Sequence, residues 1–146
     1  MMTVLSQANR DEILLRVRNL TPELSPVTGE PTVPRMLCHI ADQLAVALGD
    51  ITCKPQSTLV MRTLAKWFVL YVPVRVPFGK VNTVDEMLTT KPSSWAGDVA
   101  RFDLLLSRLA VADHVAPHSV FGKLSHREWG ILAAKHIDHH LRQFGV

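Results

Sequence analysis

Apolar side chains recur at intervals of three and four residues along most of this chain, which is the period of a helix with one buried face. The pattern predicts helices over residues 9–20, 32–48, 58–72, 94–111 and 125–145. No segment alternates apolar and polar residues for long enough to build a sheet. The predicted fold class is therefore all-α.

Turn and cap residues separate the predicted helices. Gly49 follows the second helix and suits its C-cap, and Pro73 begins an irregular connection that includes a short helical turn over residues 83–88. Ser125 and Glu128 stand in the spacing of a capping box, so the last helix has the clearest start in the chain.

The predicted helix over residues 58–72 carries apolar side chains around most of its circumference. They are Leu59, Val60, Met61, Leu64, Trp67, Phe68, Leu70 and Tyr71. Such a helix is expected to be buried on more than one side. It either covers the bundle or forms part of a homodimer interface, and the pattern leaves both interpretations open.

Composition limits the classes of function. The chain has 146 residues, of which 47% are hydrophobic, so we predict one core and a single domain over residues 1–146. A net charge of +3 is spread over scattered lysines and arginines, and no nucleic-acid partner is expected. The longest apolar stretch, residues 59–74, contains charged residues and is shorter than the roughly 20 residues of a membrane span. We therefore expect no membrane association.

The two cysteines, Cys38 and Cys53, stand in no metal or redox spacing, which suits a reducing cytoplasm. Residues 1–12 lack the apolar core of a signal peptide. A cytoplasmic location is expected.

The histidines near the C-terminus are the main candidates for chemistry. His136 and His140 are four residues apart, so one helix face presents both rings to one point. They lie in the middle of an apolar stripe, His139 lies at its edge, and Asp138 faces the other way. Two buried imidazoles need partners for their ring nitrogens, and a shared metal ion would satisfy both.

Three other histidines are less clearly placed. His39 lies on the flank of the apolar stripe of the second helix, a position that is compatible with a site shared between helices. His114 and His118 flank Pro117 after the fourth predicted helix, and we expect them to be exposed loop residues.

Two motifs connect the chain to a known family. The second predicted helix contains Met36-Leu37-Cys38-His39-Ile40-Ala41-Asp42-Gln43-Leu44, and the last contains Lys135-His136-Ile137-Asp138-His139-His140-Leu141-Arg142-Gln143-Phe144-Gly145. Together with Phe121-Gly122-Lys123-Leu124-Ser125 and Glu128-Trp129-Gly130, they resemble a family of unknown function within the DinB-like superfamily. The resemblance covers nearly the whole chain. It implies a DinB-like four-helix bundle with an additional helix in the long connection between bundle helices two and three.

The same resemblance implies a divalent metal held by one histidine of helix two and two of the last helix, here His39, His136 and His140. The chain departs from the family pattern in lacking a tryptophan shortly before Met36, and in having Pro117-His118 where the family has His-Pro. Neither departure touches the three implied ligands.

Three neutral imidazoles leave a divalent ion with an open coordination position, as in catalytic sites. Zinc and nickel suit such ligands best, and iron or manganese is also compatible with them. Asp42, Gln43 and Gln143 lie within about a turn of the ligands and are candidates for hydrogen bonds that fix the imidazole tautomers.

Three hypotheses for function follow. The first is a metal-dependent enzyme with a small-molecule substrate. Members of the wider superfamily are thiol S-transferases, so the resemblance implies attack of a low-molecular-weight thiol on an electrophile, with hydrolysis by a metal-activated water as the next reaction. The second is a non-catalytic metal- or small-ligand-binding bundle, related to stress. The third is a structural bundle whose histidines pair within the core.

Overall fold

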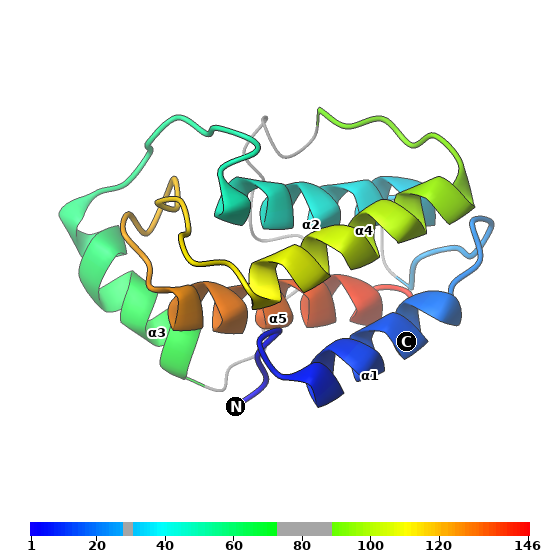
Figure 1. Cartoon of the computed structure of the whole chain (residues 1–146), viewed down its shortest axis with the longest axis horizontal. Helices are drawn as coiled ribbons and strands as arrows, with labels where there is room; N and C mark the ends of the chain where they lie inside the picture. The colour runs from blue at the N-terminus through cyan, green and yellow to red at the C-terminus, as the bar shows by residue number, and fades with distance from the viewer. Residues whose placement is uncertain (28–30, 73–88) are drawn as a thin grey trace.

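A computed structural model of the chain describes residues 1–27, 31–72 and 89–146. These residues form five helices and no strand, which confirms the all-α prediction for this part of the chain (Figure 1). The helices are α1 (Gln7–Arg18), α2 (Val33–Leu48), a π-helical turn η1 (Met61–Ala65) that continues into α3 (Lys66–Tyr71), α4 (Trp95–Ala110) and α5 (His126–Arg142).

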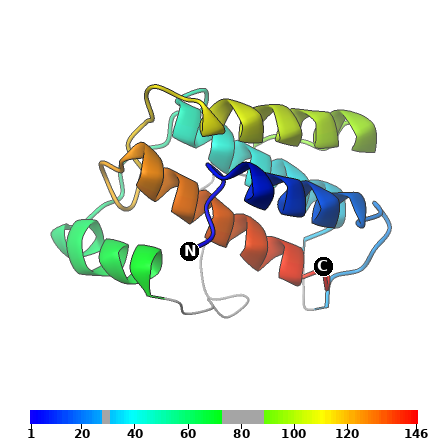
Figure 2. The ribbon, with the colours of Figure 1, turned by 60° about the horizontal axis from the view of Figure 1, so that its bottom comes forward.

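Four of the helices lie side by side along the long axis of the molecule, and α1 and α5 run opposite to α2 and α4 (Figures 1 and 2). Two ion pairs follow the parallel course of α2 and α4, Asp42–Arg101 at 2.7 Å between the helices and Asp50–Arg108 at 2.6 Å just beyond the end of α2. Two parallel helices need a long return connection. Residues 49–94 provide it, and α3 lies within it at one end of the bundle.

The core forms where α2, α4 and α5 pack together. Its largest fully buried side chains include Ile40 of α2, Phe102 of α4, and Trp129 and Ile137 of α5. Asp42 is also fully buried, and its carboxylate accepts hydrogen bonds from Arg101 and from Thr90. Because this group is paired, its burial fixes the position of α2 against α4.

The predicted end of α2 and the predicted start of α5 are confirmed, whereas α1 (predicted over residues 9–20) lies two residues earlier and α5 (predicted to residue 145) ends at Arg142. Gly49 adopts a left-handed conformation with φ of 81°, as the C-cap of α2 requires. Ser125 and Glu128 form both hydrogen bonds of the predicted capping box. Thr32 occupies the N-cap position of α2, but its side chain makes no capping hydrogen bond.

Within one chain the third helix is buried on one side only, so the interpretation that it covers the bundle with more than one face is wrong, whereas a homodimer interface is not tested by a single chain. Between residues 61 and 71 only Leu70 is buried. The reason is the position of α3, which stands at the end of the bundle and packs one face against α5 (Figure 1). The short helical turn predicted over residues 83–88 lies outside the described residues. None of the described helices has the length and apolar character needed to cross a bilayer.

Candidate metal centre

Three histidines from two helices meet at one point inside the bundle. Nε2 of His136 lies 3.0 Å from Nε2 of His39 and 3.1 Å from Nε2 of His140. The three ring centroids are 4.6–4.8 Å apart, and each pair of rings is close to perpendicular. His39 is buried, whereas His136 and His140 are half-buried. The residues expected from the sequence are therefore brought together by the packing of α2 against α5.

The distances suit a shared cation. Two nitrogens that bind one ion at about 2.0–2.1 Å are separated by about 3.0–3.4 Å. Imidazole nitrogens are ligands that zinc, nickel, copper and iron all accept. The group of three meets the geometric requirement for a metal site, and its donor atoms fit such an ion.

Gln143 sets the tautomer of one of the three histidines. Its Oε1 lies 2.7 Å from Nδ1 of His140, so Nδ1 is the protonated nitrogen that donates this hydrogen bond. Nε2 of His140 then carries a lone pair that points toward the other two rings. Gln143 is itself buried, which makes the contact well protected from water. Gln143 therefore contacts one of the three histidines, and its role at a metal site stays a prediction.

The other two residues considered for this role are placed differently. Asp42 directs its carboxylate to Arg101 and Thr90, so its contacts hold α2 against α4. The side-chain oxygen Oε1 of Gln43 is buried without a hydrogen-bond partner in the described part of the chain, as is Nδ1 of His136. Both atoms are polar, and an unpaired buried group is costly.

Burial keeps two of the three histidines neutral. It lowers the pKa of His136 well below 6.5, with His140, His39 and other neighbouring imidazoles adding to the effect. Burial, followed by the neighbouring His39, lowers the pKa of His140 to about 4. Both rings are therefore unprotonated near pH 7, which is the form that binds metals.

His118 does not match the prediction of an exposed loop residue. It is half-buried, with its ring 4.8 Å from Phe121 and 5.1 Å from Trp129 between centroids. Its Nδ1 accepts hydrogen bonds from the backbone N–H groups of Val120 and Phe121, and burial lowers its pKa to about 4. The prediction was wrong because a tight turn closed by Gly122, with φ of 68°, folds the loop back over α5. His114 is exposed, as expected.

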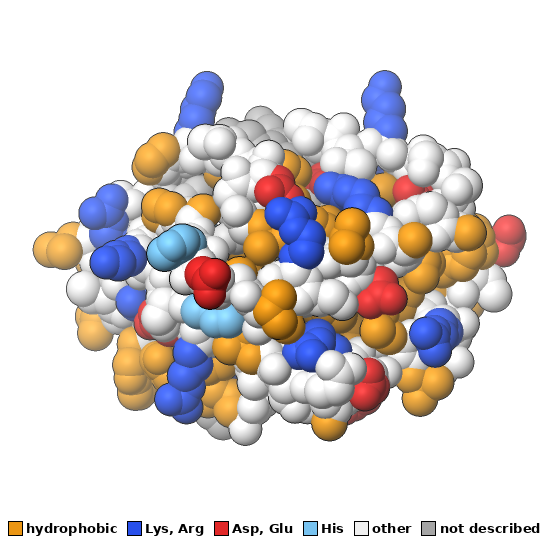
Figure 3. Space-filling model, in the orientation of Figure 1, with side chains coloured by type: hydrophobic (Ala, Val, Ile, Leu, Met, Phe, Trp, Pro, Cys, Tyr) orange, Lys and Arg blue, Asp and Glu red, His pale blue; other side chains and the backbone are white. Residues whose placement is uncertain are grey.

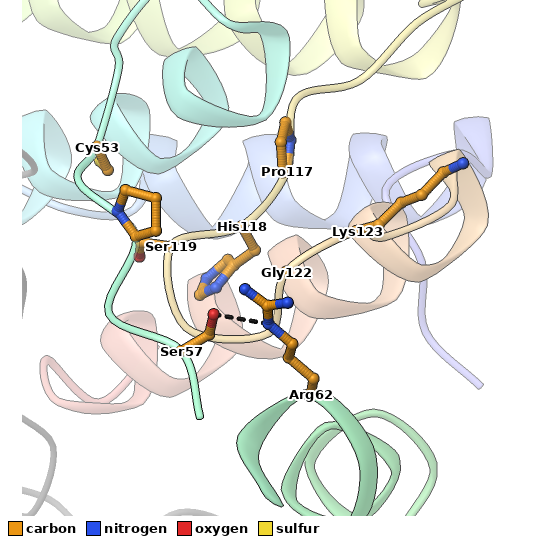
Figure 4. A pocket seen from close by; sticks show the side chains of 9 residues that line it. Cys53, Ser57, Arg62, Pro117, His118, Ser119, Gly122 and Lys123 are labelled. Atoms are coloured by element: carbon orange, nitrogen blue, oxygen red, sulfur yellow. Dashed lines mark hydrogen bonds between the residues drawn. The ribbon is translucent and has the colours of Figure 1, made fainter. Parts of the chain in front are cut away.

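His118 also lines a cavity of about 300 Å³ (Figure 4). It is lined by Cys53, Pro55, Ser57, Arg62, Pro117, His118, Ser119, Gly122 and Lys123. The guanidinium of Arg62 points into it, and its Nε donates a hydrogen bond to Ser57 at 2.8 Å. The cavity is built by two segments that are far apart in the sequence, residues 53–62 and 117–123, and no local sequence signal marks it.

His139 packs its ring against His140, with centroids 5.1 Å apart, and is half-buried. It stands outside the group of three whose nitrogens converge.

No protein-family model, curated protein or solved structure matches the chain. The described residues thus establish an all-α protein of five helices with a cluster of three histidines that could hold a metal ion.

Proposed function

We propose that this chain is a divalent-metal-dependent enzyme of the DinB-like type, with His39, His136 and His140 as the metal ligands. The observation that carries the proposal is the meeting of three Nε2 atoms at 3.0 and 3.1 Å from two separate helices. A buried cluster of this kind is costly for a protein unless it binds something, because its nitrogens lose their water. Zinc and nickel fit best, and iron or manganese remains compatible with the ligands.

When bound, such an ion supplies an open position with Lewis acidity, at which a thiol or a water loses its proton near neutral pH. The chain's own residues prepare for this in three ways. Burial holds the imidazoles neutral, Gln143 orients His140, and the Asp42–Arg101 pair fixes the helix that carries His39. These contacts preorganise the ligand geometry before any ion arrives.

Thiol S-transfer is the reaction that we propose first, and hydrolysis second. In the first, a low-molecular-weight thiol forms a carbon–sulfur bond to a small electrophile and the leaving group departs with the electron pair of its broken bond. The partly exposed faces of His136 and His140 give a small molecule access to the centre. The cavity beside His118 has the size of a small-ligand site and is the candidate place for one of the two reactants.

One observation favours the alternative of a non-catalytic metal- or ligand-binding bundle. The two carboxylates nearest to the ligands in the sequence are both engaged, Asp42 with Arg101 and Asp138 with Arg16 and Arg142. Neither is free to act as a general base. A reaction at this centre must therefore rely on the metal to lower the pKa of the bound thiol or water, or on a basic group of the substrate to accept the proton.

Metal analysis tests the binding step. We expect purified protein to carry about one divalent ion per chain, and His136→Ala to lose it, because two imidazoles bind far more weakly than three. His114→Ala is the matched control, since His114 is an exposed histidine away from the cluster. If neither the parent chain nor the control takes up a stoichiometric ion from solutions of zinc or nickel, the histidines are a structural cluster.

A screen of electrophiles with several cellular thiols tests the catalytic step. We expect turnover that chelator abolishes, that added metal restores, and that His136→Ala lacks. A chain that binds its ion stoichiometrically but shows no metal-dependent turnover with any pair, and no metal-dependent hydrolysis, is the non-catalytic module.

A further inference from the structure

The helix formed by η1 and α3 has its apolar side turned outward. Six large apolar side chains on that side are between 38% and 72% exposed. They are Val60, Met61, Leu64, Trp67, Phe68 and Tyr71. Val60, Leu64, Trp67 and Tyr71 follow one another at intervals of four, three and four residues, which is the spacing of one helix face. We call these six residues the outer stripe. In Figure 3 apolar side chains, with lysines and arginines beside them, are seen at the end of the molecule where α3 lies.

The inner side of the same helix is held by polar contacts as well as by packing. Lys66 pairs with Glu128 of α5 at 3.2 Å, and Leu70 is fully buried. Lys135 of α5 donates hydrogen bonds to the backbone carbonyls of Val69 and Val72, at 2.7 and 3.0 Å. Turning the helix to bury the outer stripe would break these contacts. The outward orientation is therefore a property of the fold.

The outer stripe is large for a monomer surface. Side chains of this size and exposure present on the order of 600–800 Å² of mainly apolar area. The largest apolar patch on a typical monomer covers about 300–600 Å². A standard protein–protein interface buries about 800 Å² on each partner. The stripe thus has the area of one half of a stable interface.

We propose that the outer stripe is a homodimer interface, on which the same stripe of a second copy packs about a two-fold axis. A two-fold interface requires a surface that is complementary to itself. The same apolar helix face from two copies satisfies this, because its rows of side chains have the same spacing and can interdigitate. The helix stands at the end of the bundle, where a second copy can approach it (Figures 1 and 2). Aromatic residues and methionine, which are common in interface cores, make up four of its six residues.

The charges of this helix favour a second copy over a lipid surface. Lys66 turns inward to Glu128, and Arg62 turns to Ser57. Two stripes can therefore meet without opposing like charges from these side chains. A helix that lies in a membrane interface instead places its lysines and arginines outward beside the apolar face, where they reach anionic headgroups.

Sedimentation analysis over a concentration series tests the proposal. We expect the parent chain to sediment as a dimer at tens of micromolar, and Leu64→Lys to dissociate at least about 30-fold more readily, since it places a charge at the centre of the interface. Leu104→Lys is the matched control, because Leu104 of α4 is similarly exposed at 60% and lies outside the stripe. Circular dichroism establishes that both variants are folded. A parent chain that stays monomeric, or a dimer that both variants leave intact, overturns the proposal.

Cross-linking provides a second test that does not depend on weakening the interface. In a Cys53→Ser background, we expect Leu64→Cys to form a disulfide-linked dimer on mild oxidation and Leu104→Cys to form little. Equal cross-linking of the two contradicts the proposal. The proposal also fails if the parent chain is monomeric and co-sediments with vesicles that contain anionic phospholipid, because the stripe then serves a membrane surface.

Discussion

Helices α5 and α3 break the usual distribution of polar and apolar residues in opposite directions. On α5, His136 and His140 stand among buried apolar neighbours, and their ring nitrogens face inward. On η1 and α3, the outer stripe exposes six large apolar side chains, while Lys66 faces the bundle. One helix buries polar groups, and the other exposes apolar ones.

Buried polar groups and large exposed apolar patches are the informative departures in a protein of unknown function, because each is unfavourable unless something binds there. The first indicates a ligand that reaches the interior, for which we propose a cation. The second indicates a partner that covers the surface, for which we propose another copy of the chain. The two sites are at different places on the molecule and can be tested separately.

The sharpest test of the comparison removes one apolar side chain from each helix. Ile137 of α5 is fully buried, and we expect Ile137→Ala to lower the free energy of unfolding by about 2–5 kcal/mol. Leu64 is 72% exposed, and Leu64→Ala should change the free energy of unfolding by less than about 0.5 kcal/mol in dilute solution. Urea unfolding measures both. A loss for Leu64→Ala as large as that for Ile137→Ala would mean that the stripe is packed within the monomer.

Two desolvated histidines, His140 of α5 and His118 of the preceding loop, should make the metal-free protein sensitive to acid. The pKa values of His140 and His118 are about 4 in the folded chain and about 6.5 in the unfolded chain, so the unfolded chain binds more protons between these pH values. Stability is therefore complete above about pH 6.5 and falls as the pH decreases toward 4. We expect a total loss on the order of 1–3 kcal/mol, since the rings are partly exposed.

Urea unfolding with chelator at pH 7.5, 6 and 5 measures this dependence. His140→Gln should reduce the slope, because glutamine does not titrate. A stability that stays constant from pH 7.5 to 5, in both the parent chain and the variant, would show that these rings are not desolvated in the folded state.

Much of the bundle could be predicted because local signals determine it. The bounds of α2 follow from apolar spacing and from Gly49, and the start of α5 follows from the capping box of Ser125 and Glu128. The pair His136 and His140 follows from helical spacing alone. Placing His39 beside them required knowledge of how α2 and α5 pack, which periodicity does not contain. The resemblance to the DinB-like superfamily provided it as an expectation.

The errors have a common physical origin. Periodicity identifies the faces of a helix, but which face is buried depends on the neighbours that the tertiary fold places beside it. For α3 the deciding neighbours are Glu128 and Lys135 of α5, more than fifty residues away in the sequence. For His118 the deciding contact is with Trp129, which a turn brings within reach. Asp42, likewise, is paired with Arg101 from a different helix.

Gln143 offers a finer test of the polar side of the comparison. Gln143→Leu keeps the size of the side chain but removes the acceptor for Nδ1 of His140. We expect metal affinity to fall by about 10- to 100-fold, which is typical for the loss of a hydrogen bond that orients a ligand. Competition titration against a chromophoric chelator measures it. Gln143→Glu, which retains an acceptor, is the control, and an unchanged affinity in Gln143→Leu would separate this residue from the centre.

The smallest effect is expected from the polar residue on the inner side of α3. Lys66→Met removes the ion pair with Glu128, in which both side chains are partly exposed, and we expect a loss of no more than about 1 kcal/mol of stability. The orientation of the helix should survive, because Leu70 and the two hydrogen bonds from Lys135 hold it independently. Acrylamide quenching of fluorescence in a variant that retains Trp67 as its only tryptophan, measured in dilute solution, reports that orientation. If Lys66→Met shields Trp67 in the monomer, the ion pair alone had kept the apolar side of the helix outward.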